Sequence, residues 1–300
     1  MRPRVTLQLP TASLTHRPNS LNGAKVLLIG YGFVARALTP DLVKAGAHVA
    51  HTTRGNGAVA FGSDAMRHAF AAADIVLSSV PPMRNGSDPA LTALAGIRSR
   101  ASWIGYLSAT SVYGDRGGQW AFEGEAPTPS LVRGQARAAA ELNWLETHPA
   151  TQVFRLAGIY GPGRAPFDRV WTGKARIVEA PNHVVNRIYV DDIVSALMAS
   201  IARPSPQDIY NIADGNPAPP GDVLRYAAKL LDVEAPPTVP VDDPSVSAMA
   251  RTFYSETKRI DIARAKTRLG WKPRFETYQQ GLSAIWDTEA LNPAGVNEEH

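Results

Sequence analysis

The pattern with the clearest chemistry is a glycine-rich turn, in which Gly30, Gly32 and Ala35 follow an apolar run at 26–29. Gly30 permits a tight turn, and Gly32 has no Cβ, so a phosphate group can approach the backbone N–H groups that begin a helix. Ala35 is small enough for that helix to pack on the preceding strand. We expect a dinucleotide pyrophosphate here, at Gly30, Gly32, Phe33, Val34 and Ala35. An ordinary strand-to-helix turn is the alternative interpretation.

The end of the second expected strand indicates which dinucleotide is bound. A site for NAD usually has a carboxylate there for the ribose hydroxyls, whereas this chain has none and continues through Thr53 to Arg54. A guanidinium can hold a 2′-phosphate with two charge-assisted hydrogen bonds. The sequence therefore favours NADP, with NAD as the alternative if Arg54 is only solvated in a turn. Ser79, near the end of the third expected strand, is a further candidate cofactor contact.

Apolar runs that alternate with amphipathic segments predict the elements that position these residues. Strands that helices cover on both faces have continuous apolar runs. Expected strands are 26–29, 48–52, 74–80, 103–107, 152–156 and 186–190. Expected helices are 33–45, 64–72, 89–98, 130–146, 193–201, 222–231 and 259–269. This alternation predicts an α/β fold, a doubly wound parallel sheet of the Rossmann type with a smaller C-terminal substrate lobe.

The same pattern suggests how the chain is divided. We expect a dinucleotide-binding domain over 23–165, to which the strand and helix near 184–203 return, and a substrate lobe over 166–287. Residues 1–22 are polar and aperiodic, so we expect a disordered extension there, and a flexible tail over 288–300.

Composition excludes several kinds of site. The chain has no cysteine, which excludes disulfides, thiolate zinc sites and iron–sulfur clusters, and its seven histidines have no metal-ligand spacing. No apolar stretch approaches the roughly 18 residues of a membrane helix, and no secretory signal begins the chain. Much of the formal charge of +4 comes from scattered arginines within 1–22, too few to bind nucleic acid well. We expect a cytoplasmic protein without a metal, a membrane partner or a nucleic-acid partner.

Three further strings carry a family resemblance. They are LSATSVYGD at 107–115, FRLAGIYGPGR at 154–164 and RIYVDDI at 187–193. With the glycine turn before them, they resemble the extended short-chain dehydrogenases/reductases, the NAD-dependent epimerase/dehydratase group, from about Lys25 to about Trp286. The resemblance implies a nicotinamide over the ends of the middle strands and a C-terminal lobe over the substrate. It also implies a catalytic Ser or Thr and a Tyr-x-x-x-Lys pair on the long helix.

The chain departs from that catalytic pattern. Ala109 stands where the family usually has the hydroxyl, and Arg133 and Arg137 occupy the Tyr and Lys positions. Arg stays protonated at any working pH, so neither arginine can exchange the proton. Arg137 could instead bind the nicotinamide ribose and Arg133 an anionic substrate. The alternative is a solvated helix face that carries both arginines and Glu141.

Nearby polar residues complete the set of candidates. The candidate catalytic residues are Ser108, Thr110, Tyr113, Arg133 and Arg137. Tyr113 is followed by Gly114, and such an aromatic more often supports a loop. Asp191 and Asp192 begin a helix, where we expect N-capping.

Two functions stay open at this point. The first is an NADP(H)-binding oxidoreductase or epimerase that acts on a small polar substrate, such as a sugar derivative, with an altered catalytic set. The second is a non-enzymatic NADP(H)-binding sensor or scaffold. Ala109 and Arg133 favour the second function, whereas the family strings at 154–164 and 187–193 favour the first. A monomer and a homodimer are both compatible with the sequence.

Overall fold

A seven-stranded parallel sheet forms the centre of the molecule. The computed structural model describes residues 21–53 and 59–290, and its sheet has the order β11-β7-β5-β4-β1-β2-β3. The order extends in both directions from β1, as in a doubly wound Rossmann sheet, which confirms the predicted fold class. The strands are β1 (Lys25–Ile29), β2 (His48–Thr53), β3 (Val59–Ala60), β4 (Ile75–Ser78), β5 (Trp103–Ala109), β7 (Thr151–Leu156) and β11 (Ile209–Ile212).

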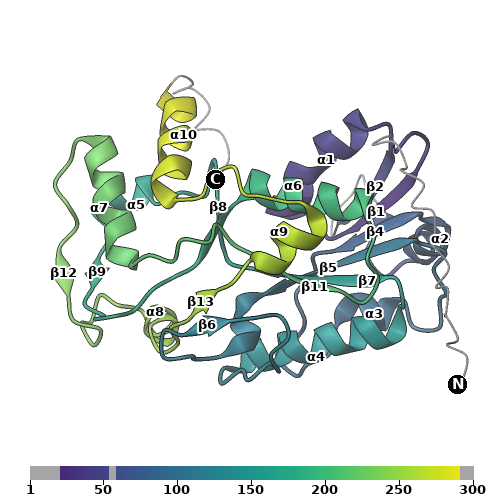
Figure 1. Ribbon diagram of the computed structural model, residues 1–300, viewed down its shortest axis with the longest axis horizontal. Helices are drawn as coiled ribbons and strands as arrows, with labels where there is room; N and C mark the ends of the chain where they lie inside the picture. The colour runs from purple at the N-terminus through teal and green to yellow at the C-terminus, as the bar shows by residue number, and fades with distance from the viewer. Residues whose placement is uncertain (1–20, 54–58, 291–300) are drawn as a thin grey trace, which may run out of the picture.

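Helices cover both faces of this sheet (Figure 1). One face carries α1 (Phe33–Lys44), α6 (Val190–Ala202) and α9 (Ala263–Leu269), and the other carries α2 (Asp64–Ala72), α3 (Pro89–Ala93) and α4 (Val132–Thr147). Successive residues of β1 supply the two cores in turn, because Leu28 packs in the first and Leu27 in the second. Both faces of the strand are therefore apolar, which explains its continuous apolar run.

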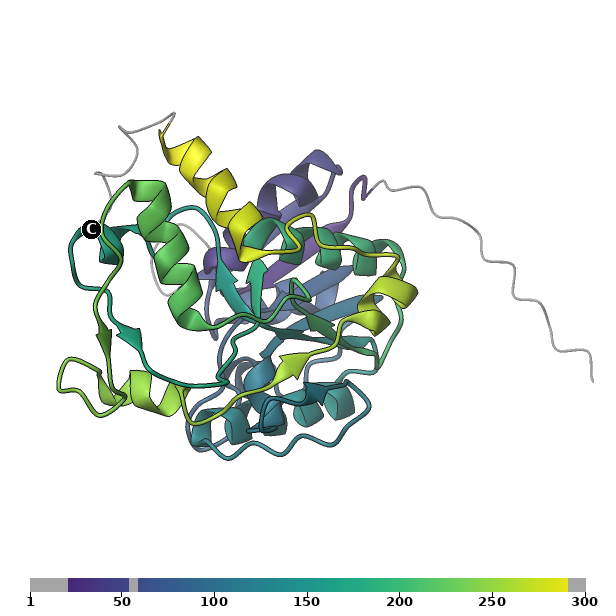
Figure 2. The ribbon, with the colours of Figure 1, turned by 60° about the vertical axis from the view of Figure 1, so that its left-hand side comes forward.

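A smaller lobe lies beside the carboxyl ends of the strands (Figures 1 and 2). It has its own apolar core, in which Phe167, Val223 and Leu282 are buried. Its elements are α5 (Phe167–Trp171), β9 (Ile177–Val178), α7 (Pro220–Leu231), β12 (Thr238–Val239), α8 (Ala248–Phe253) and α10 (Tyr278–Ala290). Strands β9 and β12 pair in parallel.

Two short parallel pairs lie between the sheet and the lobe. Strand β8 (Gly158–Tyr160) pairs with β10 (Arg187–Tyr189), and β6 (Trp120–Ala121) pairs with β13 (Arg259–Ile260). A 3₁₀ turn, η1 (Thr110–Tyr113), follows β5. These connections bring residues far apart in sequence to the same end of the sheet.

Several predicted elements differ from the structure. The helix predicted at 89–98 ends at Ala93, and Gly96 adopts a left-handed φ of +77° soon after it. The helix predicted at 259–269 is instead β13 followed by α9, because 259–260 pairs with β6. Strand β11 was not predicted, since its four residues include Asn211 and are too short to form a distinct apolar run.

The ends of the folded body also differ from those expected from the sequence. Leu21 packs against the core and its N–H donates to the Ala45 carbonyl at 2.9 Å, so the body begins before residue 23. Helix α10 continues to Ala290, beyond the expected start of the tail at 288. No helix within 21–53 and 59–290 combines the length and apolarity needed to cross a membrane.

Asp192 performs a different task from the predicted N-cap. Helix α6 has no side-chain cap, and the Asp192 carboxylate accepts hydrogen bonds from the backbone N–H groups of Arg274 and Phe275 at 2.6 and 3.0 Å. The N-capping prediction for Asp191 and Asp192 is therefore wrong. The buried Asp192 carboxylate fixes the segment before α10 onto α6.

Candidate functional site

Gly30 forms the bend between β1 and α1. Its φ of +86° lies in the left-handed region, and a Cβ there would lie 2.7 Å from Ser79 Oγ. The Gly30 N–H donates to the buried Thr52 Oγ1 at 2.9 Å, and Ser79 Oγ donates to the Ile29 and Gly30 carbonyls. The bend is thus held between the ends of β2 and β4, and it requires glycine.

Gly32 lies directly before α1 and is exposed. Its φ is −85°, and a Cβ built on it meets no described atom within 4 Å. Open space therefore lies over the first N–H groups of α1, where a phosphate group would bind. Val34 and Ala35 are buried and Phe33 is half-buried, so Val34 and Ala35 can offer backbone N–H groups rather than side chains. The turn fits the pyrophosphate that the sequence predicts.

The end of β2 carries the residues predicted to choose between NADP and NAD. Thr53 is the half-buried last residue of the strand, and no carboxylate occurs among its residues at 48–53. The ring of Tyr31 stacks on that of His51, with centroids 3.8 Å apart and an interplanar angle of 17°. Arg54 lies outside the residues that the structure describes. Its contact with a 2′-phosphate therefore stays a prediction.

Two of the predicted catalytic residues lie in a buried polar network. Ser108 Oγ donates to Glu141 Oε1 at 2.5 Å. The Tyr113 hydroxyl donates to Asn211 Oδ1 at 2.8 Å and accepts from Arg155 Nη1 at 2.9 Å. Burial raises the pKa of Tyr113. Both side chains are therefore buried and engaged within the protein, and their predicted catalytic role stays a prediction.

The predicted solvated helix face is wrong for Glu141. This side chain is 2% exposed, and its carboxylate accepts from Arg155 Nε at 3.1 Å and Nη2 at 2.7 Å. The residue belongs to the buried face of α4. Neither Arg133 nor Arg137 forms an ion pair with it in the described structure.

Arg137 lies against the end of β5. Its Nη1 donates to the Tyr106 hydroxyl at 3.1 Å and to the Leu107 carbonyl at 3.0 Å, and its guanidinium lies 5.7 Å from the Tyr106 ring centroid. Burial raises the pKa of Tyr106, an effect that Arg137 opposes. The strand end is the place where the family resemblance puts the nicotinamide. The predicted contact of Arg137 with the ribose stays a prediction.

A cavity of about 130 Å³, here called the small cavity, opens at the carboxyl end of β5. Thr110 and Ser111 line it from η1, and Arg133 lines it from the first turn of α4. Among the described residues, these three side chains have no hydrogen-bond or ion-pair partner. The structure thus brings together two of the predicted catalytic residues, Thr110 and Arg133, in a position open to a ligand.

A second part of the cavity wall consists of ionisable side chains that the sequence did not predict. They are His183, Glu256 and Lys258. Lys258 Nζ lies 3.0 Å from Glu256 Oε2, and these side chains are 10% and 8% exposed. His183 is 5% exposed, and its Nε2 has no partner among the described residues. Burial, and secondarily the Lys258 cation, lowers the pKa of His183, so its ring is neutral at pH 7.

Asn186 fixes this wall. Its Nδ2 donates to the Lys258 carbonyl at 2.8 Å, and its Oδ1 accepts from the Ile260 N–H at 2.9 Å. The residues of the wall come from segments about 70 positions apart that follow no helical or strand period. Only the tertiary fold places them in the same cavity as Arg133.

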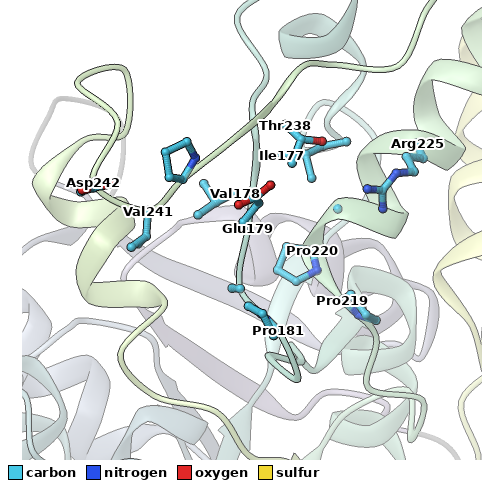
Figure 3. A pocket seen from close by; sticks show the side chains of 13 residues that line it. Ile177, Val178, Glu179, Pro181, Pro219, Pro220, Arg225, Thr238, Val241 and Asp242 are labelled. Atoms are coloured by element: carbon cyan, nitrogen blue, oxygen red, sulfur yellow. The ribbon is translucent and has the colours of Figure 1, made fainter.

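A larger cavity of about 650 Å³ lies within the lobe, between β9, β12 and the start of α7. Figure 3 shows Val178 and Glu179 on one side of it and Arg225 on the other. Arg225 already pairs with Asp222 at 3.0 Å, and prolines form much of the lining. None of the predicted site residues lines this cavity.

The chain is similar to several proteins of known structure. A conserved protein of unknown function from Silicibacter pomeroyi DSS has 38% sequence identity and a TM-score of 0.77, over 88% of this chain and 98% of that chain. The two proteins belong to one family. The UDP-glucose 4-epimerase of Thermotoga maritima matches with 19% identity and a TM-score of 0.72, over 89% of this chain and 99% of its own. The chain thus has the fold of this epimerase, which confirms the predicted resemblance at the level of the fold.

Other similarities of this chain are partial or distant. A UDP-glucuronic acid 4-epimerase from Bacillus cereus, solved in complex with NAD, has 17% identity and a TM-score of 0.69, over 89% of this chain and 98% of its own. Protein YeeZ of Escherichia coli K12 is 33% identical over 55% of this chain and 61% of its own length. A 3-diazoavenalumate denitrifying reductase from Streptomyces sp. is 31% identical over 53% of this chain and 55% of its own. The matches span less than two thirds of these curated relatives. No family model matches the chain.

Proposed function

We propose that this protein binds a nicotinamide dinucleotide at the glycine turn and uses it in an oxidoreductase or epimerase reaction on a small polar substrate in the small cavity. The observation that carries this proposal is the open space over Gly32. It lies at the start of a helix, after the first strand of a parallel sheet, where neighbouring structures of this fold include NAD complexes. Such a cofactor supplies hydride transfer when it is bound.

The residues of this chain have separable tasks in the proposed site. The N–H groups at Gly32 and Phe33 would hold the pyrophosphate, and Ser79 would line the same crevice. Arg137, which projects from α4 onto the end of β5, would face the nicotinamide ribose. Thr110 and Arg133 would contact the substrate from one wall of the small cavity.

We propose NADP as the preferred cofactor. The absence of a carboxylate at 48–53 and the presence of Arg54 in the sequence support this choice. An Asp or Glu at that position would repel the 2′-phosphate, whereas an Arg would attract it.

A second candidate, a non-enzymatic NADP(H)-binding sensor or scaffold, is favoured by a specific observation. Ala109 provides no hydroxyl, Tyr113 is engaged within the protein, and Arg133 and Arg137 cannot exchange protons. The candidates differ in whether bound NADPH is consumed. A loss of absorbance at 340 nm with small aldehydes, ketones or oxo acids would favour the enzyme, whereas tight binding without turnover would favour the sensor.

The experiment that tests cofactor binding is calorimetric titration of NADPH and NADH into wild-type protein and Gly32→Val. The valine side chain would occupy the space that the pyrophosphate needs, so NADPH binding should be lost while circular dichroism shows an intact fold. Gly124→Val is a matched control, because Gly124 is also exposed and its Cβ would lie no closer than 3.7 Å to another residue. Unchanged affinity in Gly32→Val would remove the basis of the proposal.

A further inference from the structure

The small cavity contains an unpaired cation beside two unpaired hydroxyls. Arg133 is exposed and has no hydrogen bond or ion pair with another described residue, and neither Thr110 nor Ser111 uses its hydroxyl within the described structure. All three line the cavity. Such a set of donors matches an acceptor-rich ligand group, because a guanidinium and hydroxyls together can satisfy several oxygen lone pairs.

The other charges of the lining limit the charge of that ligand. Lys258 is paired with Glu256 at 3.0 Å, and Ser130 donates to the same Glu256 carboxylate at 2.7 Å. Among the lining residues, Arg133 is therefore the cation that has no described carboxylate partner. The lining therefore has one positive charge that no described partner balances, which a monoanion would neutralise and a phosphate dianion would exceed.

The size of the cavity favours a small ligand group. A dry cavity of roughly 150 Å³ accepts one benzene molecule, and sites for larger ligands have about 300–1,000 Å³. A volume of about 130 Å³ accommodates a carboxylate and the atoms next to it, and because Arg133 is exposed, the rest of a small acid can extend towards solvent.

We infer that the small cavity binds the carboxylate of a small monocarboxylic acid, with Arg133 as the anchor and Thr110 and Ser111 as additional donors. The inference rests on the proposed function for the identity of the reaction, but the binding itself needs no cofactor. His183 also lines the cavity, and its Nε2 has no described partner, so its ring can hydrogen-bond a second polar group of the acid. Lys258, Asp115 and Arg187 are the charged residues that affect this ring.

The test uses benzoate as the probe and benzamide as a neutral probe of the same shape. Both are titrated into the full-length protein without dinucleotide, and arginine Nε–Hε signals are followed by NMR, with the Arg133 signal assigned by its loss in Arg133→Gln. We expect benzoate to shift that signal and to bind at least tenfold more tightly than benzamide. Arg133→Gln should weaken benzoate at least tenfold and leave benzamide unchanged. Inorganic phosphate should bind more weakly than benzoate.

Two further variants sharpen the test. Arg98→Gln removes another exposed arginine that has no described partner, and it should leave benzoate affinity unchanged. Glu256→Gln removes the carboxylate of the cavity and releases Lys258, so benzoate should bind more tightly. Circular dichroism checks that each variant is folded.

Several outcomes would overturn the inference. Equal affinity for benzoate and benzamide, tighter binding of phosphate than of benzoate, or full benzoate affinity in Arg133→Gln would each do so. A different measurement tests the proposed function, which fails if the wild-type protein does not bind NADPH. Benzoate binding without NADPH binding would therefore leave this inference standing.

Discussion

Glu141 and Arg155 form an ion pair in which both side chains are only 2% exposed, with 2.7 Å between Oε2 and Nη2. Glu141 also accepts the Ser108 hydroxyl, so the pair connects α4 to β5 and β7. A buried pair of this kind is costly to break, because the partner left behind is an uncompensated charge in a region of low dielectric constant.

Glu141→Leu should therefore lower the free energy of unfolding by about 3–5 kcal/mol. The double variant Glu141→Leu/Arg155→Met should lose less than the sum of the single losses, since it leaves no buried charge. Urea denaturation measures both, and Asp64→Leu, which breaks an exposed pair with Arg67, should cost at most about 1 kcal/mol. Additive losses in the double variant would show that the two residues do not act as a pair.

The two glycines of the turn should respond differently to alanine. Gly30→Ala should cost about 1–3 kcal/mol, because its φ of +86° is left-handed and a Cβ would press on Ser79 Oγ. Gly32→Ala should cost about 1 kcal/mol or less, since its Cβ meets open space. Thermal unfolding without cofactor measures the difference. Equal destabilisation would contradict the distinction between a structural Gly30 and a ligand-binding Gly32.

Arg54→Ala should weaken NADPH binding by roughly tenfold to a hundredfold, because a charge-assisted pair with the 2′-phosphate contributes about 1.5–3 kcal/mol. NADH affinity should hardly change, as NADH has no phosphate there. Calorimetry at low and high salt checks both, and the loss should shrink at high salt if the pair is exposed. An equal loss for both cofactors would mean that Arg54 supports the loop and does not select NADP.

Asp214 should make stability depend on pH. Burial raises the pKa of this carboxyl to about 7 in the folded protein, and one carboxylate oxygen has no described partner. The folded state therefore keeps the Asp214 proton up to about pH 7, whereas the unfolded state releases it near the ordinary pKa of 3.8. The free energy of unfolding is thus highest at low pH and falls as the pH rises to about 7. Asp214→Asn should gain stability relative to wild type between pH 5 and pH 8 in urea denaturation. A constant difference across that range would contradict the shift.

Much of the fold could be predicted from the sequence, because its local signals agree with one another. The apolar runs of β1 and β4 and the glycines at 30 and 32 each have a local cause in strand burial or turn geometry. Strand β11 could not be predicted, since its place at the sheet edge depends on pairing with β7 and on no pattern of its own.

The candidate site was predicted only in part, for a physical reason. Thr110 follows β5 and Arg133 lies in the first turn of α4, and local sequence patterns indicate both elements, so these residues could be found. His183 and Lys258 approach them through long-range packing of irregular segments, which leaves no periodic signal. Ser108 and Tyr113 had suitable side chains, but their burial depends on Glu141, Arg155 and Asn211, which come from three other elements.

The most direct test of the central claim is a crystal structure of the protein soaked with NADPH. We expect the pyrophosphate on the backbone N–H groups at Gly32 and Phe33, and the nicotinamide beside the end of β5, facing the small cavity with Thr110 and Arg133. A dinucleotide bound elsewhere would contradict the proposed function. So would a glycine turn that stays free of NADPH at saturating concentration.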